Sequence, residues 1–171
     1  YGTLMYVNFI FVAIFLGYSI GSAPIVSYHY GARNSEELKN LLTKSLKMIG
    51  VWSVALFALA QLIASPLARI FVGYDPNLFD LTRHGFRIFC LAFLVNGFNI
   101  YGSSFFTALN NGLLSAVISF LRTLVFQIAS VLLLPMIFGI DGIWGAVFVA
   151  EILTLCVTII CLAKKQKVYH Y

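Results

Sequence analysis

One carboxylate and one guanidinium lie deep inside long apolar runs of this sequence. Glu151 and Arg122 are each flanked on both sides by stretches of apolar residues. If those runs span a bilayer, an ionised side chain at the centre costs at least about 2.5–3.5 kcal/mol, so such groups pair or face a cavity. Two roles therefore stay open for Glu151: it binds a substrate or proton, or it forms a structural ion pair with Arg122.

Three amide side chains share this apolar setting. Asn96 and Asn99 are three residues apart, so on a helix they lie on one face. Gln127 lies midway along a different apolar run. Buried amides either line a cavity or bond across helices, for about 0.6 kcal/mol or a little more. We take Asn99, Asn96, Glu151 and Gln127 as candidates for a substrate or cation cavity.

The sequence carries no motif for a metal, a nucleotide or a covalent nucleophile. Its three cysteines lack the C-x-x-C spacing of metal sites. A phosphate loop, a nucleophile elbow and a zinc-helix motif are absent. A polytopic membrane enzyme would gather His, Asp or Glu at the interface, whereas here they are scattered singly. We therefore expect no enzyme, no metal site, no cofactor and no pump driven by ATP.

The composition requires elements that can hide a large apolar surface. Hydrophobic residues make up 61% of the chain and charged residues 10%, whereas a soluble domain carries about 25% charged residues. The net charge of +5 does not indicate nucleic acid, because the basic residues lie at the ends of apolar runs. The composition predicts an integral membrane protein whose partners include the lipid bilayer.

Five apolar runs are long enough for a spanning helix, which needs about 20 residues. They cover residues 4–28, 46–72, 85–109, 113–138 and 143–163, the second interrupted near Pro66. The sequence therefore predicts an all-α polytopic bundle forming a single transmembrane domain over 1–171, with a polar loop at 31–45. Pro24 inside the first run removes a backbone hydrogen bond and is expected to kink that helix.

The order of the spans also brings the two buried charges to similar depths. Arg122 lies about nine residues into its span and Glu151 about twelve, counted from the same side of the membrane. At about 1.5 Å per residue, their depths differ by about 5 Å. Consecutive antiparallel helices can therefore pair them.

The distribution of basic residues predicts an orientation. The loop at 31–45 with its flank and the C-terminal tail hold seven of the eleven Lys and Arg residues. Four spans separate these two segments, so they lie on one side, and the positive-inside rule makes that side cytoplasmic. The start at Tyr1 would then be external, directly before a span, so we expect further residues upstream.

Two motifs resemble the multidrug and toxic compound extrusion (MATE) transporters. The segment 17–34, GYSIGSAPIVSYHYGARN, is similar to the eighth span of that family and the cytoplasmic loop after it. The later run 106–112, FTALNNG, is similar to the region of spans ten to twelve. That second likeness continues through these residues: Ser119, Arg122, Leu133, Leu134, Pro135, Gly139, Gly142, Ile143, Trp144, Ala150 and Glu151.

The resemblance implies a fold and a function. It places the chain as spans eight to twelve of a twelve-span transporter with two six-span lobes related by an internal repeat, preceded by an N-terminal lobe. It implies an efflux antiporter in the plasma (cytoplasmic) membrane of a prokaryote, exporting cationic or amphipathic compounds in exchange for H⁺ or Na⁺. Asn99 stands where some members carry a coupling carboxylate, so coupling would then reside in the N-terminal lobe.

Two alternatives remain. A lipid-linked oligosaccharide flippase of the same superfamily would need a more cationic cavity than Arg122 alone provides. A non-catalytic membrane subunit is the other.

Overall fold

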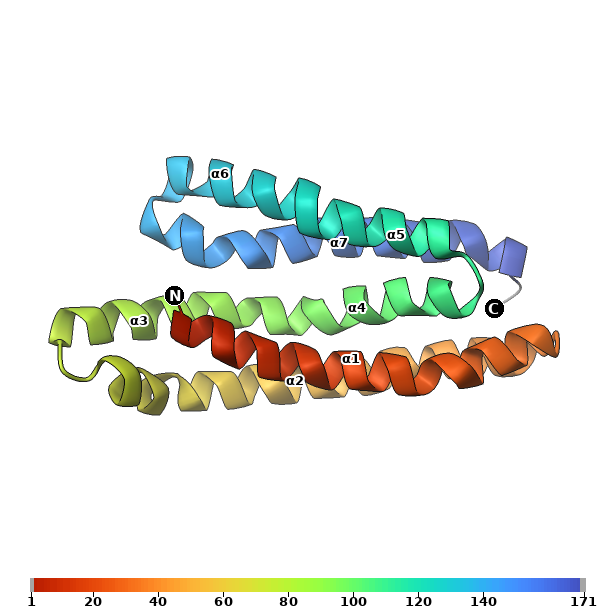
Figure 1. The fold of residues 1–171 in the computed structure, drawn as a ribbon, viewed down its shortest axis with the longest axis horizontal. Coiled ribbons are helices and arrows are strands. Elements are labelled where there is room, and N and C mark those ends of the chain that lie inside the picture. The colour runs from red at the N-terminus through yellow and green to blue at the C-terminus, as the bar shows by residue number, and fades with distance from the viewer. Residues whose placement is uncertain (1, 170–171) are drawn as a thin grey trace.

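The computed structural model describes residues 2–169, which form helices joined by short turns (Figure 1). The elements are α1 (Gly2–Gly31), α2 (Ser35–Val72), α3 (Pro76–Phe89), the 3₁₀ turn η1 (Cys90–Ala92), α4 (Phe93–Ala108), α5 (Gly112–Phe120), the π-helical segment η2 (Leu121–Phe126), α6 (Gln127–Phe138) and α7 (Ile140–Tyr169). Because α3 continues into α4 and α5 into α6, five helical rods result, each long and apolar enough to cross a membrane. The chain is a multi-pass, all-α membrane protein.

Local chemistry fixes where the helices begin and end. The side chains of Asn34, Asp75 and Asn111 accept backbone N–H bonds from the first turns of α2, α3 and α5, at 2.9 to 3.2 Å. Such caps satisfy N–H groups that have no partner within the helix. Arg33 and Asn110, just beyond helix ends, adopt left-handed φ values of 54° and 60°. This conformation stops a helix and turns the chain back.

Most of the polar segment at 31–45 is helical. Only residues 32–34 separate α1 from α2, and residues 35–45 are already helical. Asn34 caps this start, and Glu36 and Glu37 occupy the first turn, where acidic side chains suit the positive end of the helix dipole. Residues 35–49 contain neither glycine nor proline, so the polar lead-in and the span form one continuous helix.

Two further details differ from the sequence-based expectation. The third rod begins at Pro76 rather than near residue 85, because Asp75 caps it and proline suits a first helical position. Helix α2 passes through Pro66 without the expected interruption. Helix α1 likewise continues through Pro24, so the kink expected there stays a prediction.

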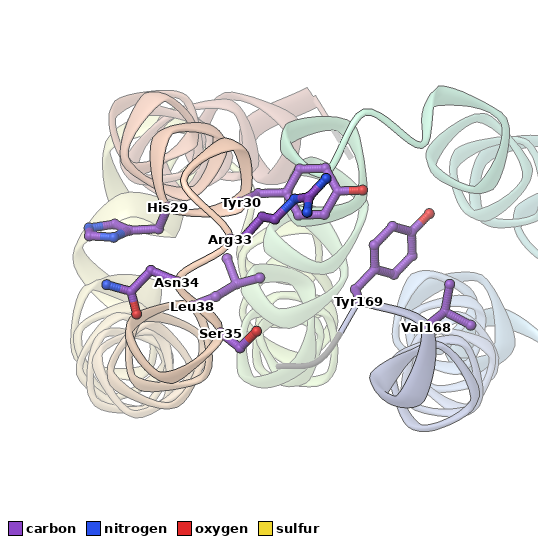
Figure 2. A pocket seen from close by; sticks show the side chains of 8 residues that line it. All are labelled: His29, Tyr30, Arg33, Asn34, Ser35, Leu38, Val168 and Tyr169. Atoms are coloured by element: carbon purple, nitrogen blue, oxygen red, sulfur yellow. The ribbon is translucent and has the colours of Figure 1, made fainter.

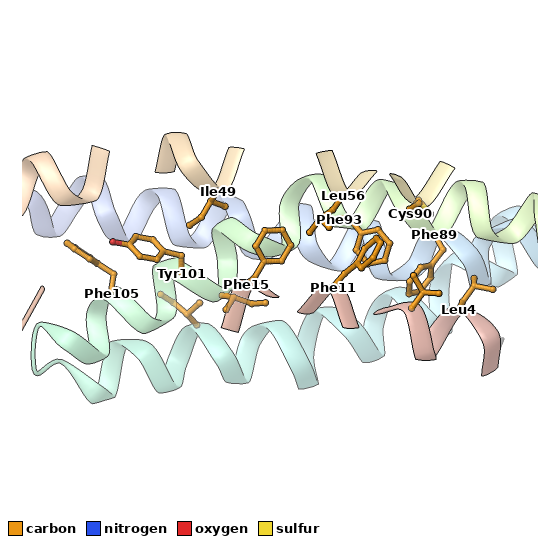
Figure 3. Packing of buried hydrophobic residues seen from close by; sticks show 14 of the residues in the cluster. Leu4, Phe11, Phe15, Ile49, Leu56, Phe89, Cys90, Phe93, Tyr101 and Phe105 are labelled. Atoms are coloured by element: carbon orange, nitrogen blue, oxygen red, sulfur yellow. The ribbon is translucent and has the colours of Figure 1, made fainter. Parts of the chain in front are cut away.

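Helix α4 is the centre of the bundle. It packs against α1, α2, α5 and α7 and lies between the α1–α2 pair and the group formed by α5, α6 and α7 (Figure 1). Aromatic rings fill the contact with α1, where Phe11 and Phe93 have ring centroids 4.7 Å apart (Figure 3). Gly97 allows the close approach, since a Cβ there would lie 2.5 Å from the Phe15 ring.

The two ends of the bundle differ in charge. The α1–α2 turn and the end of α7 lie at one end of the molecule, and the α2–α3 and α6–α7 turns at the other (Figure 1). We call the first of these the basic end; its Lys and Arg residues are Arg33, Lys39, Lys44, Lys47, Lys164, Lys165 and Lys167. At the opposite end, exposed His84 and Asp141 lie 2.9 Å apart and link α3 to α7.

Candidate functional site

A buried polar cluster joins three rods near the middle of the bundle. Arg122 Nη2 lies 2.7 Å from Glu151 Oε1 and donates to it, and Arg122 Nε donates to the same oxygen at 2.9 Å. The second carboxylate oxygen of Glu151 accepts a 2.7 Å bond from Asn99 Nδ2. Glu151 is only 4% exposed and Asn99 is fully buried. Both oxygens of the carboxylate are therefore occupied by protein donors.

The two asparagines complete the cluster from α4. Asn96 Oδ1 accepts a 2.6 Å bond from Arg122 Nη2. Asn99 Nδ2 also donates to the Glu151 backbone carbonyl at 2.8 Å, and its Oδ1 accepts from the Thr158 hydroxyl at 3.3 Å. A buried polar group is tolerated when its hydrogen bonds are satisfied. The cluster meets that condition and fixes α4, the η2 segment and α7 against one another.

The backbone at Arg122 is unusual. Residues Leu121–Phe126 form a π-helical segment between α5 and α6, a wide turn that is rare and appears mostly within α-helices at functional sites. This segment packs against α7. It therefore carries Arg122 at the point where the rod meets Glu151. Hydrophobic periodicity gave no indication of it.

Not every candidate residue joins the cluster. Gln127 follows the π-helical segment and is half-buried. No described residue is hydrogen-bonded to its side-chain amide. Pro24 lies on an exposed part of α1. Gly17 and Gly21, whose small-x-x-x-small spacing suggests close helix packing, meet no atom within 4 Å of an added Cβ. Close approach occurs at other glycines, among them Gly97 and Gly102 on α4, where an added Cβ would lie 2.5 and 2.3 Å from a neighbouring side chain.

A hydroxyl-lined groove adjoins Arg122. It has a volume of about 280 Å³ and lies between α1, α4 and α5. Ser103 bonds to Ser115 at 2.8 Å and to Ser119 at 3.0 Å, and Thr107 donates to Ser115 at 2.7 Å. Ser119 lies three residues before Arg122, so the hydroxyls lead along one helix face to the guanidinium. We name this feature the hydroxyl groove.

Neither the hydroxyl groove nor Thr158 is predicted from the sequence. The pattern that could have found them is helical spacing. Thr158 lies seven residues after Glu151, which is two turns along the same face. Ser115 and Ser119 are four apart and precede Arg122 on one face. Single Ser and Thr residues attract little notice in an apolar run, because such helices tolerate them easily.

A second hollow of about 210 Å³ opens at the basic end, between the α1–α2 turn and the last turns of α7 (Figure 2). Tyr30 and Tyr169 stack edge to face, with ring centroids 5.7 Å apart. Tyr169 also accepts a 2.7 Å bond from Asn111. In Figure 2, His29 and Tyr169 lie on opposite sides of this hollow. These contacts fit aromatic anchoring at the membrane interface.

No cluster of three or more His, Cys, Asp or Glu side chains suited to a metal occurs within residues 2–169. We take the buried cluster together with the hydroxyl groove as the candidate site.

Comparison with known proteins points to one family. The MatE family profile matches residues 1–133. No curated protein matches the chain. A crystal structure of MATE in complex with MaL6 is 18% identical, with a TM-score of 0.89 over 98% of this chain and 38% of that one. Two further structures show outward-facing and inward-facing conformations of a multidrug resistance MATE family transporter of the MOP superfamily. Each is 18% identical to this chain, with a TM-score of 0.90.

The coverage is also similar for those two conformations: 98% and 97% of this chain, and 38% and 39% of the compared chains. The chain therefore spans little more than a third of the length of the solved structures that it matches.

Proposed function

Because the chain belongs to the MatE family, we propose that it forms part of a secondary efflux antiporter. The antiporter exports cationic or amphipathic compounds in exchange for H⁺ or Na⁺, and requires no other cofactor. Its site is the hydroxyl groove beside the Arg122–Glu151 cluster. The observation that carries this proposal is an open groove of about 280 Å³ that gathers several hydroxyls and Arg122 on an otherwise apolar bundle. Polar residues inside membrane helices commonly line substrate or ion pathways.

The buried cluster has a mechanical role in this proposal. Its hydrogen bonds connect three rods. The rods therefore move together when the transporter changes between its outward-facing and inward-facing conformations. The likeness to both an outward-facing and an inward-facing transporter supports a rigid unit, because one fold serves each conformation. Glu151 then holds the lobe together, and solutes contact the serine hydroxyls.

We further propose a location and a partner. The basic end faces the cytoplasm, in line with the positive-inside rule, and the membrane is the plasma (cytoplasmic) membrane of a prokaryote. A second lobe of similar size completes the substrate cavity. The difference in length supports this, since the compared structures are more than twice as long as this chain.

The oligosaccharide flippase is less well supported. A pyrophosphate group needs free cationic donors, and Arg122 is the one basic residue that lines the hydroxyl groove. Its guanidinium is already bound to Glu151 at 2.7 Å. This pairing leaves little positive charge for a phosphate.

Transport can be measured with this chain combined with its second lobe and reconstituted in proteoliposomes loaded with ethidium. We expect ethidium efflux to accelerate under an imposed pH gradient or an imposed Na⁺ gradient, but not under both equally. The double variant Ser103→Ala/Ser115→Ala should slow efflux several-fold, because it removes the bonded hydroxyls of the groove. Thr123→Ala, at an exposed position of the π-helical segment, is the matched control.

Two results would contradict the proposal. Folded protein that shows no gradient-dependent efflux would leave the non-catalytic subunit as the better description. A rate of ethidium efflux that stays the same with and without either gradient would rule out antiport.

A further inference from the structure

A groove runs between α2 and α7 on the side of the bundle away from the hydroxyl groove. These two helices both pack against α4 and scarcely touch each other. Two adjoining hollows occupy the space, an inner one of about 270 Å³ and an outer one of about 310 Å³. Leu46, Ile159 and Leu162 line both hollows. The two hollows therefore form one continuous groove, which we name the α2–α7 groove.

The inner part of the α2–α7 groove is apolar. Phe98 of α4 and Leu155 of α7 line it together with the three shared residues. Its one polar residue, Thr158, donates its hydroxyl to Asn99 at 3.3 Å. That hydroxyl is thus committed to the buried cluster. Nothing in the inner groove offers a hydrogen bond, so a hydrocarbon chain suits it and a polar solute does not.

The outer part of the groove ends in polar groups at the basic end. Lys39, Thr43 and Gln166 line it there. Lys39 forms no ion pair with any residue in the described range, where the salt bridges are His84–Asp141 and Arg122–Glu151. Its ammonium can therefore bind an anion at the mouth of the groove.

The length of the groove fits one leaflet. Along α7 it extends from Leu155 to Gln166, eleven steps along the helix, or about 16 Å at about 1.5 Å per residue. Half of a hydrocarbon core of about 30 Å is about 15 Å. A hydrocarbon tail in the inner groove thus places its headgroup level with Lys39.

We propose that the α2–α7 groove binds one anionic phospholipid. One acyl chain lies along Phe98, Leu155 and Ile159, and the phosphate accepts hydrogen bonds from Lys39. The charge complementarity is local, because Lys39 lines the groove whereas Lys44, also exposed and five residues further along α2, does not. Basic pockets between membrane helices are known to recognise lipid headgroups in this way. The site does not depend on the proposed transport function.

The test is native mass spectrometry of the detergent-purified protein mixed with phosphatidylglycerol or phosphatidylcholine. We expect a one-to-one adduct with phosphatidylglycerol and a weaker one with phosphatidylcholine. Lys39→Gln should weaken the phosphatidylglycerol adduct roughly tenfold, which corresponds to about 1.4 kcal/mol. Lys44→Gln is the matched control and should leave the adduct unchanged.

A second variant tests the acyl chain. Ile159 is 55% exposed in the groove wall, so Ile159→Trp fills the groove without disturbing the core. It should abolish the adducts of both lipids while the protein keeps its unfolding temperature. Equal losses from Lys39→Gln and Lys44→Gln would show diffuse attraction and overturn the headgroup site. Full lipid binding by Ile159→Trp would overturn the placement of the acyl chain.

Discussion

At the scale of single residues, the main feature is a carboxylate whose two oxygens both accept hydrogen bonds from protein donors. Both oxygens of Glu151 accept bonds, one from Arg122 and the other from Asn99. A group that binds a passing cation needs an oxygen free to coordinate it. In this conformation the contacts of Glu151 therefore favour a structural role, and whether it also takes part in transport stays a prediction.

Removing one member of the pair should destabilise the protein strongly. Glu151→Gln leaves the Arg122 charge without a counter-ion, and loss of one partner of a buried ion pair costs about 3–5 kcal/mol. Arg122→Gln should have a similar effect, since it strands the carboxylate. We expect either variant to lower the yield of folded protein and its unfolding temperature in detergent.

The double variant Arg122→Gln/Glu151→Gln separates pairing from other losses. It should be more stable than the sum of the single effects predicts, by about 0.5–3 kcal/mol, as expected for residues in contact. Simple additivity would mean that the two side chains act independently. Normal yield of Glu151→Gln with lost ethidium efflux would instead assign the residue to transport.

Part of the site could be predicted at this scale. The sequence brings Arg122 and Glu151 to similar depths on consecutive spans, and it places Asn96 and Asn99 on one face. It does not indicate Thr158 or the bonded serines, because a hydroxyl can satisfy itself within its own helix. Gln127 shares the apolar setting of the asparagines in the sequence, but it follows the π-helical segment and does not join the cluster.

At the scale of the elements, the five spans follow from apolar length, whereas their detailed form does not. Helix α2 is longer than its apolar run because Asn34 caps a polar lead-in. The π-helical segment carries Arg122 to a partner 29 residues away. Hydrophobic periodicity indicates the span but not this wider turn within it. Tertiary contact therefore decides such features, and a single sequence cannot supply them.

The close packing of α4 yields a prediction at this scale. Gly97→Ala places a Cβ 2.5 Å from the Phe15 ring, so α1 and α4 must separate. Overpacking of this kind costs about 1–3 kcal/mol. Thermal unfolding in detergent should show a lower midpoint for Gly97→Ala than for the unmodified protein.

Gly21→Ala is the matched control, because a Cβ there meets no atom within 4 Å. It should be neutral or stabilising by up to about 1 kcal/mol, since alanine is the better helix former. A loss of stability in Gly21→Ala as large as that in Gly97→Ala would contradict the packing argument.

At the scale of the whole molecule, the two ends of the bundle carry different charge. The basic end combines residues from α2 and the last turns of α7, which are far apart in sequence. Such a concentration predicts which end stays in the cytoplasm during insertion.

Chemical labelling in cells tests the orientation. Single cysteines at Glu36→Cys and Asn77→Cys lie at exposed positions of opposite ends. A membrane-impermeant maleimide should modify Asn77→Cys in intact cells, and Glu36→Cys only after permeabilisation. The reverse pattern would contradict the positive-inside prediction. The unmodified protein, whose cysteines lie within the helical rods, gives the background.

Because the two members of the buried ion pair are separated in sequence, they are synthesised at different times. Arg122 leaves the ribosome 29 residues before Glu151. Chains are synthesised at about 5–20 residues per second, so Glu151 is added about 1.5–6 s after Arg122. A lone charge is unfavourable in lipid throughout that delay. The nascent rod of α5, η2 and α6 must therefore remain beside the insertion machinery, in a wet or protein-lined environment, until α7 emerges and releases it.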